Sequence, residues 1–223
     1  MSRKFCYLFM LFIGLSFVVA VSTTALAEEF YKGKTLRFVV GYSPGGGYDT
    51  YTRAAARHIG KFIPGNPTPI VQNMTGAGSL IAANYIYKRA KPDGLTIGVW
   101  NGGLVLQQAL GARGIRFKGD KFGWIGSPIR GAPACAIMGH TGLKTFKDVL
   151  KSKRPLNMGA TRAGSTTDDL PRILNKTMGT KFKVISGYKG TAMIRIGLLK
   201  KELDGVCFGW ESMMVTARGM LDS

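Results

Sequence analysis

Short apolar runs alternate with polar, glycine-rich turns and with helical patterns along most of the chain. The first run, at 36–40, is rich in β-branched and aromatic residues and has the length of a buried strand. The turn at 43–47 carries three consecutive glycines, which can adopt the positive φ angles of a tight reversal. Asp49 and Thr50 are acceptable N-caps for a helix over 51–59. This stretch predicts a strand, a turn and a helix in immediate succession.

The same unit recurs in both halves of the chain. Strands alternating with helices of this length predict parallel sheets with helical crossover connections. In such sheets ligands bind beyond the carboxyl ends of the strands, which is where the turns between these elements fall. The further strands are expected at 69–72, 95–100, 156–160, 182–186 and 204–209, and the further helices at 79–89, 104–110, 145–151, 168–178 and 192–200.

The segment 122–138 interrupts this repeat. It reads as extended chain, it is broken by Pro128 and Pro133, and it is followed by a turn instead of a long helix. We interpret it as a crossover between two α/β lobes that face one another across a cleft. The expected organisation is lobe 1 at 28–124, the interlobe crossover at 125–138 and lobe 2 at 139–223.

The first 27 residues have the pattern of a secretory signal peptide. Arg3 and Lys4 form a basic start, 5–20 is apolar, and the small residues at 22–27 end in Ala-Leu-Ala. A retained membrane anchor is the alternative, but the apolar run is short and its exit is small and polar. We therefore expect cleavage after Ala27 and a periplasmic protein.

The charge is strongly positive, because 31 Lys and Arg residues stand against 12 Asp and Glu residues and give a net charge of +19. The basic residues are spread singly or in pairs, without a long run or an aromatic RNA-binding signature. We therefore expect no nucleic-acid partner. A positive field of this kind favours small anionic ligands or anionic partners.

The turn at 43–47 has the features of an anion site, since a glycine-rich turn that opens a helix presents unpaired N–H groups at the positive end of the helix dipole. A dinucleotide site is a weak alternative. Residues 45–50 lack the last glycine of the G-x-G-x-x-G pattern, and no acidic residue closes a second strand near position 70. Asp49 is expected to cap the helix or brace the loop, because its carboxylate would repel an anionic ligand.

Cleavage would remove Cys6 and leave Cys135 and Cys207. Two cysteines in an oxidising compartment permit one disulfide, but each lies in a short apolar run, which favours two buried thiols. His58 and His140 stand apart from other Cys or His residues at ligand spacing, so we expect no metal site and no cofactor.

No catalytic set is predicted, and we expect a protein that is not an enzyme. A periplasmic hydrolase that uses Ser43 or Ser165 is the weaker alternative, because each serine would need a neighbouring base. A ligand-sensing or scaffold protein would use the same cleft and stays open.

Several short motifs occur in one order over nearly all of the expected mature chain. The motifs are P-G-G-G-x-D at 44–49, N-x-x-G-A-G at 73–78, A-x-P-D-G at 90–94, W-I-G-S at 124–127, G-A-x-x-x-G-S at 159–165, Y-K-G-T-A at 188–192 and L-D-G-V at 203–206. Through them the sequence resembles the extracytoplasmic solute receptors of tripartite tricarboxylate transporters, the Bug or TctC-like family.

The resemblance implies a two-lobed periplasmic-binding-protein fold (Venus-flytrap, type II-like), here C-terminally truncated, because members of the family continue for about a further third of this length. It also implies a small carboxylate ligand and membrane permease subunits as partners. Members often carry an Asp-Ser pair after the last strand, where this chain has Trp210 and Glu211. The expected ligand contacts lie on four turns and are Ser43, Gly45, Gly46, Gly47, Tyr48, Thr75, Gly76, Ala77, Gly164, Ser165, Thr166, Tyr188, Gly190 and Thr191. Arg162 is weighed as a carboxylate partner and left out, because single arginines are mostly solvated.

Overall fold

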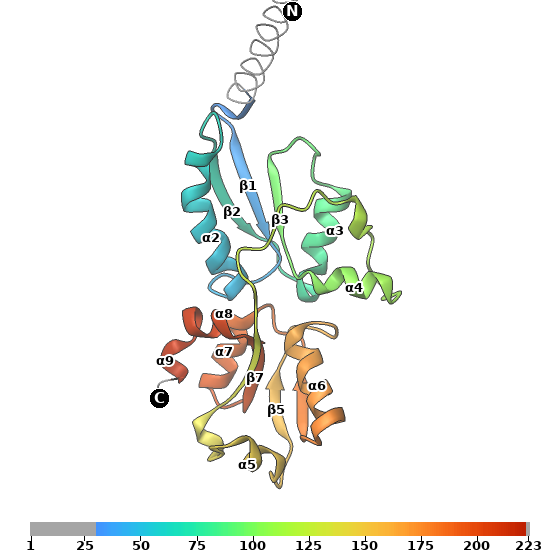
Figure 1. The fold of residues 1–223 in the computed structure, drawn as a ribbon, viewed down its shortest axis with the longest axis vertical. Helices are drawn as coiled ribbons and strands as arrows, with labels where there is room; N and C mark the ends of the chain where they lie inside the picture. The colour runs from blue at the N-terminus through green and yellow to red at the C-terminus, as the bar shows by residue number, and fades with distance from the viewer. Residues whose placement is uncertain (1–29, 222–223) are drawn as a thin grey trace, which may run out of the picture.

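The computed structural model describes residues 30–221, and the predicted signal peptide lies outside the described residues. The chain forms two lobes stacked along the long axis, each built on its own β-sheet (Figure 1). This is the two-lobed α/β organisation predicted from the alternating pattern. No helix in the range 30–221 is long and apolar enough to span a membrane.

Lobe 1 contains a three-stranded parallel sheet in the order β2-β1-β3. Its strands are β1 (Thr35–Val40), β2 (Thr68–Asn73) and β3 (Thr96–Val99), and its helices are α2 (Gly47–Ile59), α3 (Leu80–Lys88) and α4 (Gly103–Ala109). In the strand register Val40 lies level with Asn73 on one side and with Val99 on the other. The three strands therefore end together, and the turns that follow them emerge side by side at the edge facing lobe 2 (Figure 1).

Lobe 2 contains a four-stranded sheet in the order β4-β7-β5-β6, in which only β4 runs antiparallel to its neighbour. The strands are β4 (Pro133–Ile137), β5 (Leu156–Gly159), β6 (Phe182–Ile185) and β7 (Gly205–Gly209). The helices are α5 (Phe146–Leu150), α6 (Thr166–Met178), α7 (Thr191–Leu199), α8 (Trp210–Thr216) and α9 (Arg218–Leu221). Short 3-10 turns, η1 to η4, occupy Gly60–Phe62, Ala77–Ser79, Gly119–Lys121 and Gly139–Thr141.

In each lobe, helices pack on the sheet, and the buried apolar side chains form two separate clusters. On β7, Val206 and Phe208 pack with Ile194 of α7, whereas Cys207 between them packs with Met158 on the opposite face. This alternation is the two-residue period of a strand buried on both faces. In lobe 1 one cluster gathers around Leu36, Phe38 and Ala56 under α2, and another around Leu80, Ala83, Leu104 and Phe117 under α3 and α4.

The cysteines form a disulfide, which corrects the expectation of two buried thiols. Cys135 and Cys207 are direct partners across the antiparallel β4–β7 pair, and their sulfur atoms are bonded. Cys207 is fully buried, but Cys135 on the edge strand is exposed. The apolar runs were correctly recognised as strands, but sequence alone could not show that residues 72 positions apart lie opposite one another.

The helices that follow the glycine-rich turns begin earlier than predicted. Helix α2 begins at Gly47 instead of residue 51, with Gly46 as its N-cap, and α6 begins at Thr166 instead of residue 168. Of the segment expected as the crossover, residues 133–137 form β4 of the second sheet, and the link passes over residues 125–132.

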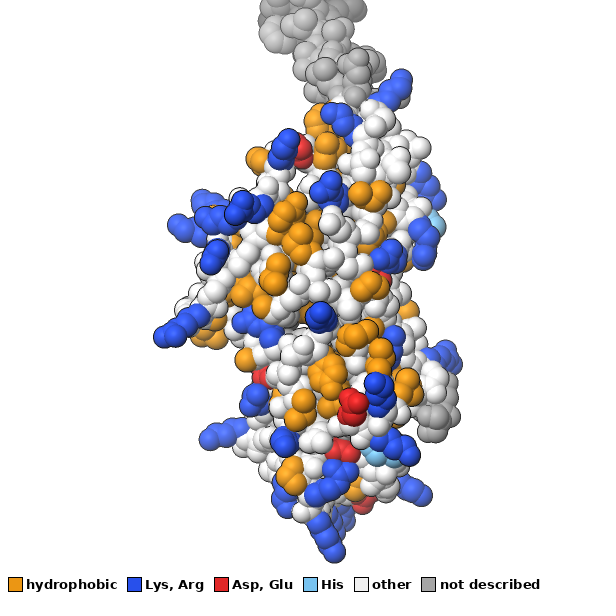
Figure 2. All heavy atoms as spheres, turned by 180° about the vertical axis from the view of Figure 1, so that it is seen from behind, with side chains coloured by type: hydrophobic (Ala, Val, Ile, Leu, Met, Phe, Trp, Pro, Cys, Tyr) orange, Lys and Arg blue, Asp and Glu red, His pale blue; other side chains and the backbone are white. Residues whose placement is uncertain are grey.

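Lys and Arg side chains cover both lobes, with few Asp and Glu among them, on the face seen in Figure 2. This distribution agrees with the scattered basic residues in the sequence.

Candidate ligand-binding site

The turn after β1 is held by a buried carboxylate. Asp49, in the first turn of α2, accepts hydrogen bonds from the backbone N–H of Gly45 at 2.9 Å, from Nε of Arg53 at 2.9 Å and from Nδ2 of Asn73 at 2.8 Å. Burial by itself would raise the pKa of Asp49, but these hydrogen bonds outweigh it and hold the pKa below its ordinary value. The prediction that Asp49 braces the loop is confirmed; the N-cap is Gly46.

The second turn of lobe 1 has an unusual backbone. Gly76, Ala77, Gly78 and Ser79 all have positive φ angles, so the chain curls tightly before α3 begins. The hydroxyl oxygen of Ser79 accepts the backbone N–H of Asn101 at 3.0 Å. The turns after β2 and β3 are thereby tied together at the edge of the sheet.

In lobe 2, most hydroxyl groups of the turn after β5 form hydrogen bonds within the turn itself. Thr167 Oγ1 accepts the backbone N–H of Thr161 at 3.0 Å, and Ser165 Oγ donates to the carbonyl oxygen of Arg162 at 2.7 Å. The N–H of Gly164 is donated to Asp169 at 3.0 Å. Gly164 and Ser165 were expected to donate to a ligand, but their donors are paired within the protein. Thr166, the third contact expected here, is exposed.

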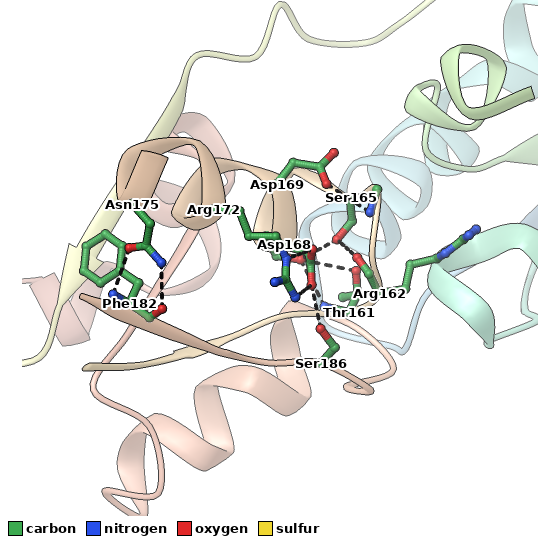
Figure 3. A network of polar contacts seen from close by, with 11 residues as sticks. Thr161, Arg162, Ser165, Asp168, Asp169, Arg172, Asn175, Phe182 and Ser186 are labelled. Carbon is green, nitrogen blue, oxygen red and sulfur yellow. Dashed lines mark hydrogen bonds and ion pairs between the residues drawn. The ribbon is translucent and has the colours of Figure 1, made fainter. Parts of the chain in front are cut away.

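Figure 3 shows the hydroxyl and carboxyl groups of this turn gathered at the start of α6. Asp168 accepts from Nε of Arg172 at 2.6 Å and from the hydroxyl of Ser186 at 2.7 Å. Burial alone would raise the pKa of Asp168, but the hydrogen bonds from Arg172 and Ser186 lower it overall, so the group is ionised. Arg162 points away from this network, toward the elements of lobe 1 (Figure 3).

The two lobes are in direct contact through the predicted turns. The backbone N–H of Ser43 donates to the carbonyl oxygen of Lys189 at 3.0 Å, and Nη2 of Arg195 donates to the carbonyl oxygen of Gly45 at 3.2 Å. A Cβ atom added to Gly190 would lie 2.5 Å from Ser43 Oγ. The turn after β1 and the turn before α7, which are about 145 residues apart in the sequence, therefore form one surface.

Further glycines mark close approaches around this surface. A Cβ added to Gly46 would lie 3.1 Å from Thr191 Oγ1, and one added to Gly47 would lie 2.5 Å from Ser212 Oγ of α8. A Cβ on Gly164 would overlap the amide of Gln107 from α4. The absence of a side chain at these positions is what permits the contact.

The remaining predicted contacts are distributed as follows. Tyr48 stacks on the buried ring of Tyr42, with centroids 4.6 Å apart, so it packs on lobe 1 and exposes 39% of its surface. Thr75, Gly76 and Tyr188 are half-buried, and Ala77 is exposed. Among residues 30–221, none of these four residues forms a side-chain hydrogen bond to the opposite lobe.

Three buried side-chain atoms in the range 30–221 have no hydrogen-bond partner: Ser43 Oγ, Arg162 Nη1 and Arg195 Nη1. All three are donors, and all three belong to residues at the contact between the lobes. Burial lowers the pKa of Arg195, as expected for a cation withdrawn from water. A buried donor without a partner costs on the order of 1–3 kcal/mol, so a hydrogen-bond acceptor at this surface would stabilise the folded protein.

Two residues at the start of α8 form hydrogen bonds with the segment that links the lobes. Trp210 donates its backbone N–H to the carbonyl oxygen of Ala132 at 2.8 Å, and the Glu211 carboxylate accepts the N–H of Ala132 at 3.2 Å. Glu211 is therefore engaged with the link, at the position where the resembled family often carries Asp-Ser.

Sequence reasoning missed Arg195 and Tyr42 and left out Arg162. Arg195 had a visible signal, because it is the only charged residue in the apolar helix 191–199. Tyr42 lies between the strand and the glycines and donates its hydroxyl to the carbonyl oxygen of Gly78 at 3.4 Å. Nothing in the local pattern indicated that its side chain turns toward the second turn.

Comparison with solved structures identifies the fold. The chain matches a structure described as a periplasmic transporter, with 20% identity, a TM-score of 0.74, and coverage of 85% of this chain and 64% of that one. It matches the periplasmic binding protein BugD with 21% identity, a TM-score of 0.66, and coverage of 85% and 63%. It matches MatC from Rhodopseudomonas palustris, solved with bound malate, with 22% identity, a TM-score of 0.71, and coverage of 83% and 64%.

The fold is that of the two-lobed periplasmic binding proteins. The matches span less than two thirds of the length of these neighbours. No protein-family model matches the sequence, and comparison with curated protein sequences finds no match.

Proposed function

We propose that this chain is an exported solute receptor that binds a small organic anion, a carboxylate, between its two lobes. The observation that carries the proposal is the set of three buried, unpartnered donors, Ser43 Oγ, Arg162 Nη1 and Arg195 Nη1, at the contact between the lobes. A carboxylate offers two oxygen atoms that only accept hydrogen bonds, and it would neutralise the buried guanidinium groups. The likeness to MatC, which was solved with malate, supports the same class of ligand.

The proposed contacts come from opposed turns. In lobe 1 they are the Ser43 hydroxyl and the turn at 46–48, with 75–77 beside it; in lobe 2 they are Thr166, Tyr188, Gly190 and Thr191. The N–H groups of Gly45 and Gly164 and the hydroxyl of Ser165 are left out, because each already donates to a group of the protein. The start of α2 contributes because the first N–H groups of a helix lack partners within it. Asp49 does not oppose the ligand, since its charge is paired with Arg53 and its oxygens are occupied.

Closure of the lobes would strengthen this binding. When water is excluded from the contact between turns, each hydrogen bond to an anion acts in a medium of low dielectric constant. Residues 125–132 connect the lobes, so a change in the angle between them is concentrated there and in the chain near α8. We place the boundary between lobe 1 and lobe 2 in this segment.

We further propose that the receptor delivers its ligand to the permease subunits of a tripartite tricarboxylate-type transporter in the membrane, and that it reaches the periplasm by cleavage after Ala27. A receptor that passes the ligand signal to a sensor would use the same cleft. Binding without catalysis is proposed because each unpartnered side-chain atom buried at the contact, among residues 30–221, can donate a hydrogen bond to an anion.

The first test is a thermal-shift screen of the purified protein against malate, succinate, adipate, citrate and acetate at fixed ionic strength. An acid present at about 100 times its dissociation constant stabilises the folded state by about 2.7 kcal/mol. For a protein of this size, that is a rise of about 5–10 °C in the unfolding midpoint. A midpoint that none of these acids moves would refute the proposed ligand class.

The matched pair of variants is Gly46→Asp and Gly139→Asp. Both add one negative charge, but Gly46 faces Thr191 across the contact and Gly139 has open space around it. The first should abolish the ligand-dependent shift and the second should retain it. Equal shifts in both variants would remove the turn after β1 from the site.

A further inference from the structure

Arg162 extends from the turn after β5 of lobe 2 and packs onto lobe 1. Its side chain points away from the polar network of its own lobe (Figure 3). A Cβ atom on Gly78 would overlap Cγ and Cδ of Arg162, so the aliphatic part of the arginine occupies the space that a side chain at position 78 would fill. Gly78 has a φ of +57°, a value that glycine adopts without strain. The backbone of the second turn is thus shaped to receive this arginine.

The guanidinium group of Arg162 forms no ion pair with a carboxylate among residues 30–221. Within the same range, Nη1 is buried without a hydrogen-bond partner. Asp169, at the start of α6, accepts the N–H of Gly164, and the charge of Arg162 acts on it without forming an ion pair. An arginine that served only to strap the lobes together would be expected to hydrogen-bond to the lobe it reaches.

Two buried polar residues of lobe 1, Tyr42 and Ser43, lie on the turn that meets lobe 2. Tyr42, which is 5% exposed, places its hydroxyl against the carbonyl oxygen of Gly78, and the charge of Arg162 acts on that hydroxyl. The next residue, Ser43, is 6% exposed, and its Oγ is a second unpartnered donor. Two unpartnered donors, Ser43 Oγ of lobe 1 and Arg162 Nη1 of lobe 2, therefore lie along the contact between the lobes.

We propose that Arg162 is a ligand-binding and specificity-determining residue: its guanidinium group pairs with the carboxylate of the bound acid, while its aliphatic part seats on Gly78. The inference rests on the proposed function. Because the same side chain contacts lobe 1 and the anion, binding of the acid and approach of the lobes become one event. The pairing favours a carboxylate over its neutral amide or ester, since a buried guanidinium opposite a neutral group keeps an unpaired charge.

The test compares Arg162→Met, Arg162→Lys and Arg57→Met in the full chain. Methionine keeps much of the aliphatic packing on Gly78 but removes the charge, and lysine keeps a charge without the planar fork. Arg57 is exposed in the last turn of α2, so its replacement makes the same change in net charge away from the contact. Affinities for malate, succinate, adipate and citrate are measured by calorimetry, and unfolding midpoints are measured without ligand.

We expect Arg162→Met to weaken binding of the acid by at least about 30-fold, as for truncation of one partner of a buried charge pair. Arg162→Lys should retain part of the affinity, and Arg57→Met should match the parent chain. Without ligand, the midpoint of Arg162→Met should equal or exceed that of the parent, because a buried unpaired cation has been removed.

Three results would overturn the inference. Unchanged affinity in Arg162→Met would exclude the pairing and leave the proposed function in place. A lower unfolding midpoint in the ligand-free Arg162→Met protein would assign Arg162 a structural role, even if this variant also binds the acid more weakly. If the parent chain binds none of the four acids, the proposed function fails and the inference falls with it.

Discussion

The backbone N–H of Ser43 donates to the carbonyl oxygen of Lys189 over 3.0 Å, and this hydrogen bond joins the glycine-rich turn of lobe 1 to the turn before α7 of lobe 2. Ser43 is buried, yet its hydroxyl has no partner. The main chain of this residue thus holds the lobes together while its side chain remains available. The close approach depends on Gly190, whose lack of a Cβ lets the two turns meet.

Gly190→Ala should keep the lobes apart. The added Cβ would lie 2.5 Å from Ser43 Oγ and 3.2 Å from the backbone nitrogen of Ser43, so the turns must separate. We expect a larger radius of gyration by small-angle X-ray scattering and a weaker affinity for the bound acid. Gly139→Ala, in open space, is the control. Adding Ser43→Ala should partly restore the compact form; an unchanged radius in Gly190→Ala would contradict this account.

Asp49→Asn should destabilise lobe 1. The substitution removes the ion pair with Arg53 and weakens the hydrogen bond from Gly45, and the side chain of Asp49 is only 3% exposed. Since Arg53 is 44% exposed and can be solvated, we expect a loss of about 1–3 kcal/mol in urea denaturation. Asp120→Asn, at an exposed pair with Lys121, should change stability by less than about 0.5 kcal/mol. Equal effects of the two substitutions would argue against the brace.

Asp204 should make the stability of lobe 2 sensitive to acid. The Arg154 guanidinium holds the pKa of Asp204 at about 2, against the opposing effect of burial and with help from the backbone N–H of Asn157. A pKa that is depressed in the folded state contributes stability that is present above the unfolded pKa, near 4, and is lost as the pH falls toward 2. Urea midpoints measured between pH 5 and pH 2 should fall more in the parent chain than in Asp204→Asn. Parallel pH profiles would show that Asp204 does not contribute.

Reduction of the disulfide should destabilise the protein. The bond between Cys135 and Cys207 closes a loop of 72 residues, and a loop of this length corresponds to about 4 kcal/mol in the chain-entropy model. We expect a lower urea midpoint with dithiothreitol and in the variant with both cysteines changed to serine, in which the reductant should have no further effect. Identical midpoints for the oxidised and the fully thiol-labelled protein would contradict the prediction.

Sequence patterning predicted the elements because it depends on local chemistry. The strand at 36–40 and the helix after the glycines were recognisable, since a run of Val and Phe, a block of glycines and an amphipathic stretch each restrict the backbone within a few residues. The boundary of α2 was wrong by four residues, because Asp49 was read as a cap although its carboxylate folds back to the N–H of Gly45.

The candidate site was predictable only as a set of turns. The turns at 43–47 and 188–192 could be proposed because glycines and helix starts expose N–H groups in any parallel α/β sheet. The sequence could not show which of these donors form hydrogen bonds within the protein. Gly164 and Ser165 looked equivalent to Ser43 in the sequence, but Asp169 and the carbonyl oxygen of Arg162 take their protons, whereas the hydroxyl of Ser43 is left without a partner.

By itself the sequence determined the order of strands and helices, the two-lobed α/β fold and the turns at the strand ends, because each depends on spacing and composition over short stretches. Only the tertiary structure decided that Cys135 bonds to Cys207, that Arg162 rests on Gly78, and that Arg195 reaches Gly45. These pairs are separated by 72, 84 and 150 positions in the sequence. No local preference specifies such contacts; they arise when the packing of two sheets and their helices brings distant turns to one surface.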